Sequence, residues 1–198
     1  MNDAQLEKAL GLLRRVAEAI AKLPSQLQMH VEVGEGTVEV TFESNPADTR
    51  RLVGRDADNL KQLAALFRLL ARNTGKIVRL CDLIPNNEPE PPFKPYTPDL
   101  NWPRAEIEGL LRDLAEAVFE LPAEVTTEPH NAFSVKMRVT ILGDLTGNRV
   151  LSIFDKACNV LFVPIGTNNG MKIYAHAQDY CKAITATRTP ANGRASSR

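Results

Sequence analysis

The sequence predicts an α+β protein built from two tandem copies of one α-β-β-α-α-β plan. Residues 11–24 (GLLRRVAEAIAKLP) and residues 109–122 (GLLRDLAEAVFELP) are identical at nine of fourteen positions, at a constant offset of 98. After this helix-like segment, each copy shows the two-residue alternation of strands and then apolar residues at helical spacing again. We therefore expect two three-stranded sheets, each with its helices packed on one face.

The composition is that of a folded protein. Of the 198 residues, 43% are hydrophobic and 24% are charged, which excludes a disordered chain. Lys and Arg together number 24, as do Asp and Glu, so the chain is not a histone-like polycation. Three widely spaced cysteines, Cys81, Cys158 and Cys181, fit reduced thiols better than a disulfide framework. No apolar run approaches the ~20 residues of a membrane span, and residues 1–5 lack a secretory signal, so we expect a cytoplasmic protein without membrane association.

The first copy is expected at residues 1–84. Apolar residues at helical spacing predict a first helix that ends at Pro24. Alternating apolar and polar residues around a Gly-Glu-Gly turn predict an antiparallel hairpin with one buried face. Pro46 suits the first turn of a short helix, and residues 73–75 (NTG) end the long helix after it. The expected elements are a helix over 6–23, strands over 27–33 and 38–42, a short helix from 44, a helix over 57–73 and a strand over 76–81.

The second copy is expected at residues 104–184, in a diverged form. Pro164 stands where its long helix should continue, so we expect that helix to end there. Residues 151–156, where the turn between the helices should lie, contain no glycine, and we expect no phosphate site in this copy. The expected elements are a helix near 104–120, strands near 124–129 and 133–141, a helix near 146–163 and a strand near 171–177.

Residues 85–103 connect the copies and hold seven of the thirteen prolines, which favours an extended linker. Phe93, Tyr96 and Trp102 favour a linker docked against one or both copies, because a free linker needs no aromatic residues. A proline-rich motif that binds another protein is the alternative. Residues 185–198 are small, polar and basic, as in a flexible tail.

A motif lies between the two helices of the first copy. Residues 46–63 (PADTRRLVGRDADNLKQL) contain Pro-x-Asp, then basic and aliphatic residues, then a Gly-x-x-Ala turn that opens a helix. This run resembles, without gaps, the core of the small bacterial KH-domain RNA-binding proteins, whose turn is Gly-x-x-Gly. The order of elements over residues 5–84 resembles theirs as well. The resemblance implies a tandem KH-like fold whose turn clamps the backbone of about four single-stranded nucleotides.

Backbone chemistry supports an anion site at such a turn. The first N–H groups of a helix lack intrahelical partners and lie at the positive end of its dipole. Glycine allows a phosphate to approach closely, and basic side chains add an attraction that salt screens. The candidate RNA-binding residues are Arg50, Arg51, Gly54, Arg55, Asp56, Ala57, Lys61 and Arg68.

The turn departs from the family pattern. Ala57 replaces the second glycine, and Arg50 stands where the family usually has another glycine. Asp56 suits a cap of the following helix better than a ligand role, because its carboxylate would accept from the donors that a phosphate needs.

The charge distribution keeps RNA binding open. Residues 45–80 hold eight basic and three acidic residues, whereas residues 104–184 hold eight basic and ten acidic ones. Lys61, Arg68 and Arg72 are spaced i, i+7 and i+11, which places them on one helical face. A merely solvated outer face is the alternative interpretation.

The sequence offers no set of residues for catalysis. His30, His130 and His176 lie in three different elements, with no Cys or carboxylate at metal-ligand spacing. Nucleotide-binding loops and nucleophile elbows are absent, and Cys158 lies among apolar residues, as a core residue would. We expect no enzymatic activity, no cofactor and no metal.

Two functions remain. The first is non-catalytic, weak binding of single-stranded RNA by the first copy. The second is a degenerate KH scaffold that binds a protein partner or a second copy of itself without RNA. The altered turns favour the scaffold. The local positive charge and the ungapped resemblance favour RNA binding, which we place first.

Overall fold

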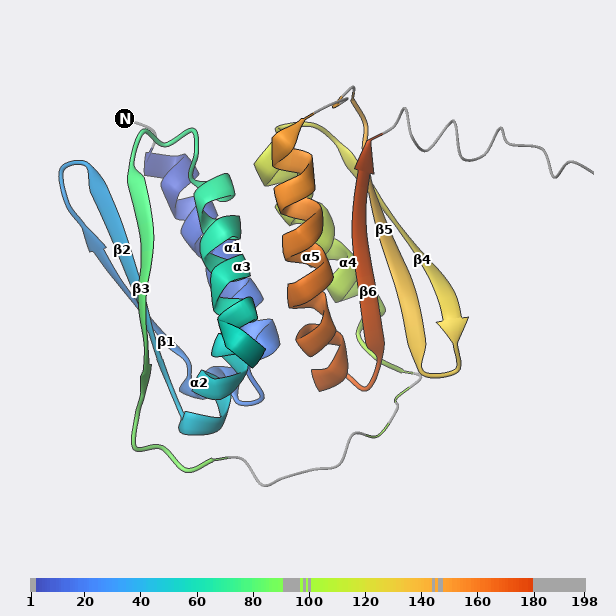
Figure 1. The fold of residues 1–198 in the computed structure, drawn as a ribbon, viewed down its shortest axis with the longest axis horizontal. Coiled ribbons are helices and arrows are strands. Elements are labelled where there is room, and N and C mark those ends of the chain that lie inside the picture. The colour runs from blue at the N-terminus through green and yellow to red at the C-terminus, as the bar shows by residue number, and fades with distance from the viewer. Residues whose placement is uncertain are drawn as a thin grey trace, which may run out of the picture.

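The computed structural model describes residues 3–90, 97, 99, 101–143, 145 and 148–179. Over these residues the protein is α+β, with two three-stranded mixed sheets and five α-helices (Figure 1). Phe93, Tyr96, Cys181 and the expected tail over 185–198 lie outside the described residues. Trp102, at the end of the linker, is half-buried and packs against the hydrophobic core, as expected of a docked segment.

The first half has the predicted α-β-β-α-α-β order. Strand β1 runs antiparallel to β2, and β3 runs parallel to β2 in the order β1-β2-β3. The alternating residues Val38, Val40 and Phe42 of β2 are buried beneath the helices, as the pattern predicts. The elements are α1 (Asp3–Ile20), β1 (Gln28–Val33), β2 (Thr37–Ser44), α2 (Pro46–Val53), α3 (Asp58–Leu70) and β3 (Ile77–Pro85).

The second half repeats this sheet with one helix fewer. Its strands are ordered β4-β5-β6, with β4 antiparallel and β6 parallel to β5. One continuous helix, α5, takes the place of α2, the turn and α3, so this half has no inter-helix turn. The elements are α4 (Arg104–Phe119), β4 (Ala123–Asn131), β5 (Ser134–Ile141), α5 (Arg149–Asn168) and β6 (Lys172–Asp179).

Two expectations about proline were wrong. Helix α1 ends at Ile20, before Pro24, which instead begins a short 3₁₀ turn (Pro24–Gln26). Helix α5 does not end at Pro164 but continues to Asn168. Proline costs that helix one backbone hydrogen bond. The residues after it, Ile165 and Gly166, are buried, and Gly166 packs closely on β6, so tertiary packing maintains the last turn.

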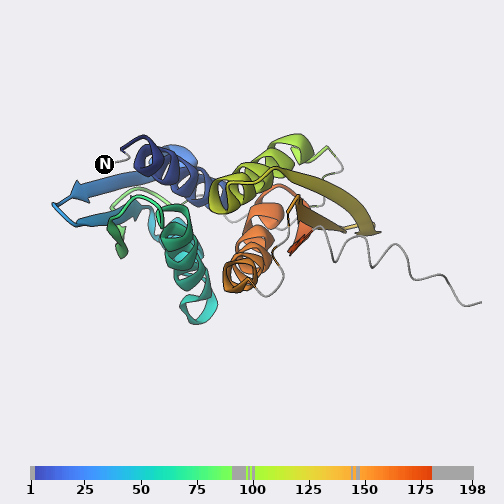
Figure 2. The same ribbon diagram turned by 90° about the horizontal axis from the view of Figure 1, so that it is seen from above.

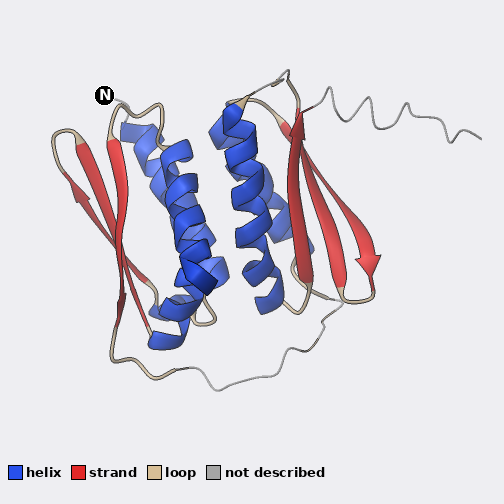
Figure 3. Ribbon diagram, viewed as in Figure 1, coloured by secondary structure: helices blue, strands red, loops and turns tan. Residues whose placement is uncertain are grey.

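The two halves dock through their helices. The long helices lie between the two sheets, which form the outer layers (Figures 1 and 3). Helix α3 packs along α5, and α1 packs against both α4 and α5. The buried hydrophobic residues of both halves form one continuous cluster. In each half, the sheet covers one face of the helices. The opposite face of those helices is covered by the helices of the other half.

The halves are related by an approximate twofold axis. Arg15 and Asp113 are equivalent positions of the repeat, and Arg15 Nη1 donates to Asp113 Oδ2 at 2.6 Å. In an arrangement with twofold symmetry, equivalent positions contact each other only beside the axis. Figure 2 shows the result: α1 and α4 lie together on one side of the molecule, and α3 and α5 lie together on the other.

Helix α5 is long and apolar enough to cross a membrane, by length and composition alone. In the structure its large apolar residues Phe154, Leu161, Phe162 and Ile165 are almost fully buried. The helix packs against β6, α3 and α1. Its apolar composition is therefore that of a core helix.

The aspartate of the Pro-x-Asp motif connects α2 to the end of α1. Asp48 is fully buried, and its carboxylate accepts from Lys22 N (2.7 Å), Leu23 N (3.0 Å) and Asn45 Nδ2 (2.8 Å). The Asn45 side chain in turn caps α2 by accepting from Asp48 N at 3.0 Å. This aspartate therefore has a structural role.

Replacing Asp48 with alanine should lower the free energy of unfolding by about 2–4 kcal/mol, because buried donors lose their acceptor. Urea denaturation measures this loss. The matched control is Asp82→Ala on β3, whose side chain is exposed and whose backbone is not left-handed; it should change stability by less than about 0.5 kcal/mol. Equal stability of the two variants would contradict the structural role of Asp48.

Candidate nucleic-acid interface

The turn between α2 and α3 is built from residues with unusual backbone angles. Gly54 has φ 73° and ψ 179°, while Asp56 (φ 53°) and Ala57 (φ 59°) are left-handed. The Gly54 conformation is essentially restricted to glycine. These three residues reverse the direction of the chain between the helices. The Gly-x-x-Ala pattern is therefore explained by the backbone conformation of the turn, without reference to a ligand.

The space beside Gly54 is filled by the protein itself. A Cβ at this position would lie 2.7 Å from Cγ of Asn59. Asn59 Nδ2 donates to the carbonyl of Arg51 at 2.7 Å and so satisfies an acceptor at the end of α2. This role of Asn59 is not visible in the sequence, because a single polar residue in the first turn of a helix gives no signal of a contact to the preceding helix.

The expected cap by Asp56 is wrong. Ala57 occupies the N-cap position of α3, and that position makes no side-chain cap hydrogen bond. Asp56 lies one residue too early, is exposed, and offers only its carbonyl, which accepts from Lys61 Nζ at 2.8 Å. The first turn of α3 is therefore left without a side-chain cap, although it carries the exposed carboxylate of Asp58.

The two adjacent arginines of α2 have separate roles. Arg50 is exposed, and its Nη2 lies 2.8 Å from Glu90 Oε1. Arg51, a candidate RNA-binding residue, is half-buried, and its Nη1 donates to Asn168 Oδ1 at the end of α5. The structure therefore removes Arg51 from the candidate interface.

Asn168 links the two halves. Its Nδ2 donates to the carbonyls at the end of α1, those of Ala19 (3.2 Å), Ile20 and Ala21 (3.4 Å). These carbonyls lack intrahelical partners, and a side chain from the other half provides the donor. The sequence suggested only a turn at residues 168–170, since no local pattern identifies a contact to a helix nearly 150 residues away.

The remaining basic residues lie on α3 and in the turns at its two ends. Arg55, Lys61, Arg68 and Arg72 are all exposed, and Arg55, Arg68 and Arg72 have no ion-pair partner among the described residues. The helix buries its opposite face, including Leu63, Leu66, Phe67 and Leu70. The predicted basic face of α3 is confirmed for Lys61 and Arg68, whereas Arg72 lies in the turn beyond the end of the helix at Leu70. It begins at the turn, where Gly54, Asp56 and Ala57 lie.

Thiol and imidazole groups do not assemble into a reactive site among the described residues. Burial, with a smaller contribution from Asp155, raises the pKa of the Cys158 thiol well above its usual value. Burial and then Glu39 raise the pKa of Cys81, which forms the bulge of β3. His30 and His176 lie on exposed strand faces near Glu43 and Asp155. No three potential metal ligands lie together in the described part of the chain.

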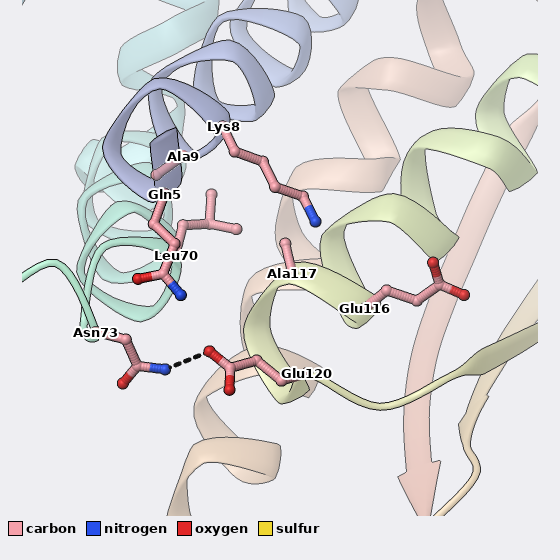
Figure 4. A pocket seen from close by; sticks show the side chains of 8 residues that line it. All are labelled: Gln5, Lys8, Ala9, Leu70, Asn73, Glu116, Ala117 and Glu120. Atoms are coloured by element: carbon pink, nitrogen blue, oxygen red, sulfur yellow. Dashed lines mark hydrogen bonds between the residues drawn. The ribbon is translucent and has the colours of Figure 1, made fainter. Parts of the chain in front are cut away.

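A hollow of about 280 Å³ lies between α1, α3 and α4 (Figure 4). Its charged lining consists of Lys8, Glu116 and Glu120, and Asn73 Nδ2 donates to Glu120 Oε1 at 2.6 Å. Two carboxylates against one ammonium group make the hollow unsuited to a phosphate. It does not extend the basic face of α3.

The turn can be tested by a double-mutant cycle. Gly54→Ala should lower the free energy of unfolding by about 2–3 kcal/mol, through backbone strain and a clash with Asn59. In an Asn59→Ala background the same change should cost about 1 kcal/mol less, because only the strain remains. Chemical denaturation of the four proteins gives the coupling. Strict additivity would show that Gly54 does not make room for Asn59.

Comparison of the chain with models of protein families, with curated proteins and with solved structures finds no match.

Proposed function

We propose that the protein is a non-catalytic nucleic-acid-binding protein that binds single-stranded RNA weakly. The observation that carries the proposal is the row of exposed basic side chains, Arg55, Lys61, Arg68 and Arg72, which begins at the α2–α3 turn. A polyanion gains affinity from such a row by releasing counterions. The resemblance of residues 46–63 to KH-domain proteins favours RNA among the polyanions, and with it a KH-like identity for both halves.

The site would contact phosphates rather than bases. The uncapped first turn of α3 offers backbone N–H donors, and the side chains of Arg55 and Arg68 offer charge. The exposed face of α3 carries no aromatic side chain on which a base could stack. Affinity would therefore come almost entirely from charge, which implies weak, sequence-tolerant and strongly salt-dependent binding.

A scaffold that binds a protein is the second candidate, and two observations favour it. Asn59 fills the space beside Gly54, and Arg51 is committed to Asn168. Large apolar side chains are also exposed on both sheets and their loops, namely Ile77, Ile84, Phe133 and Tyr174. Such a scaffold would not depend on the basic residues of α3.

Fluorescence anisotropy with a labelled mixed-sequence RNA of about 12 nucleotides, at two salt concentrations, separates the two candidates. The wild-type protein should bind with a salt slope of about −0.7 per phosphate contacted, for roughly two to four contacts. The variant Arg55→Glu/Arg68→Glu should bind at least about tenfold more weakly. Its thermal unfolding midpoint should not change, because both side chains are exposed.

The matched control is Arg14→Glu/Arg112→Glu. These arginines are equivalent positions of the repeat, are exposed on α1 and α4, and change the net charge by the same amount. The control should retain wild-type affinity within about twofold. An equal loss in both variants would mean that net charge, not this site, governs binding. No binding by the wild-type protein at low salt would favour the scaffold.

A further inference from the structure

Helix α5 carries a second exposed face with basic residues. Arg149, Ser152, Lys156, Val163 and Thr167 are its exposed residues, and their spacing of three, four or seven places them on one face. Arg149 and Lys156 are basic, and neither has an ion-pair partner among the described residues. The sequence does not indicate this basic face, because residues 104–184 taken together are slightly acidic.

The exposed faces of α3 and α5 lie on the same side of the molecule. Helix α3 packs against β3, α1 and α5, while α5 packs against β6, α1 and α3. Each helix is therefore open only on the side away from α1 and α4, which Figure 2 shows as one common side. Neighbouring helix axes lie about 8–10 Å apart, so a single extended ligand can reach both faces.

The two helices run in opposite directions, which brings their basic ends together. Arg51, in the last turn of α2 and before the turn that opens α3, donates to Asn168 at the end of α5. The C-terminal end of α3, with Arg68 on the helix and Arg72 just beyond it, consequently lies at the same end of the molecule as the start of α5, with Arg149 and Lys156 (Figure 1). The approximate twofold axis thus places a basic patch of the second half beside that of the first.

The charge of this side differs from that of the opposite side. Helices α3 and α5 carry four basic and two acidic residues, whereas α1 and α4 carry five basic and seven acidic ones. One of the two acids, Asp155, accepts from Ala177 N at 2.7 Å and lies 3.5 Å from His176 Nδ1, so its carboxylate is directed toward β6. The other acid, Asp58, is exposed in the first turn of α3. The α3/α5 side therefore has a net basic excess, which is complementary to an anionic polymer.

We infer that one single-stranded RNA crosses from α3 to α5, so that Arg149 and Lys156 of the second half complete the binding surface. This inference rests on the proposed function and adds residues to it. The second half, which lacks an inter-helix turn of its own, contributes phosphate contacts through a helix face. A strand of about four nucleotides would be held by the first half alone, and a longer strand would contact both halves.

The test uses the full chain with the variant Arg149→Glu/Lys156→Glu and labelled RNAs of about 4 and about 12 nucleotides. For the longer RNA we expect affinity to fall about five- to tenfold and the salt slope to become shallower by about 1.4, as for two lost phosphate contacts. For the short RNA, affinity should stay within about twofold. Arg14→Glu/Arg112→Glu is again the control of equal charge change.

The variant should fold, because a glutamate in the first turn of a helix suits the helix dipole and Lys156 is exposed. Arg149→Gln/Lys156→Gln is the second variant; it loses the same two phosphate contacts, so the salt slope should again become shallower by about 1.4, with a smaller fall in affinity because no negative charge is added. If Arg149→Glu/Lys156→Glu binds the longer RNA like wild type while Arg55→Glu/Arg68→Glu does not, the inference is overturned and the proposed function stands. If neither variant differs from wild type, both are overturned.

Discussion

The packing of the two helix layers against each other is the constraint on which the rest of the structure depends. Each half covers one face of its sheet with helices, and those helices carry more apolar surface than one sheet can bury. Leu12, Leu66 and Leu111 all belong to one cluster that runs through both halves. Burial of apolar surface is the dominant favourable term in folding. Because both halves contribute to the same cluster, they share one hydrophobic core instead of having two separate ones.

Docking in turn assigns roles to polar residues near the contact. Asn168, in the last turn of α5, donates from its side-chain amide to an unpaired carbonyl at the end of α1 and accepts from the Arg51 guanidinium with its side-chain oxygen. The same residues would be unremarkable surface groups in an isolated half. Near the α2–α3 turn, Asn59 donates to a backbone carbonyl of α2, and Asp48 accepts from a backbone N–H that follows α1. These motif residues therefore have structural roles whether or not a ligand binds.

The charge pattern follows from the same geometry. Because α1 and α4 share one side and α3 and α5 the other, a chain with no net charge presents a basic side and an acidic one. The Arg15–Asp113 pair on the axis is exposed and contributes at most about 1 kcal/mol. The pair marks the approximate twofold axis: equivalent positions of the two halves carry opposite charges, whereas a symmetric dimer would place two identical ones there.

The sequence by itself determined the order of elements, the buried residues of β2 and the basic face of α3, because periodicity of two or 3.6 residues is a local property of the chain. From the missing glycine in residues 151–156 it predicted a second half without a phosphate site, but it did not predict that one continuous helix would replace the turn there. Only the tertiary structure decided that α5 continues past Pro164, that Arg51 turns inward, that Asn59 fills the turn and that Arg149 and Lys156 lie on the side of α3. Each of these depends on which surface another, distant segment covers, and no local spacing of residues encodes that.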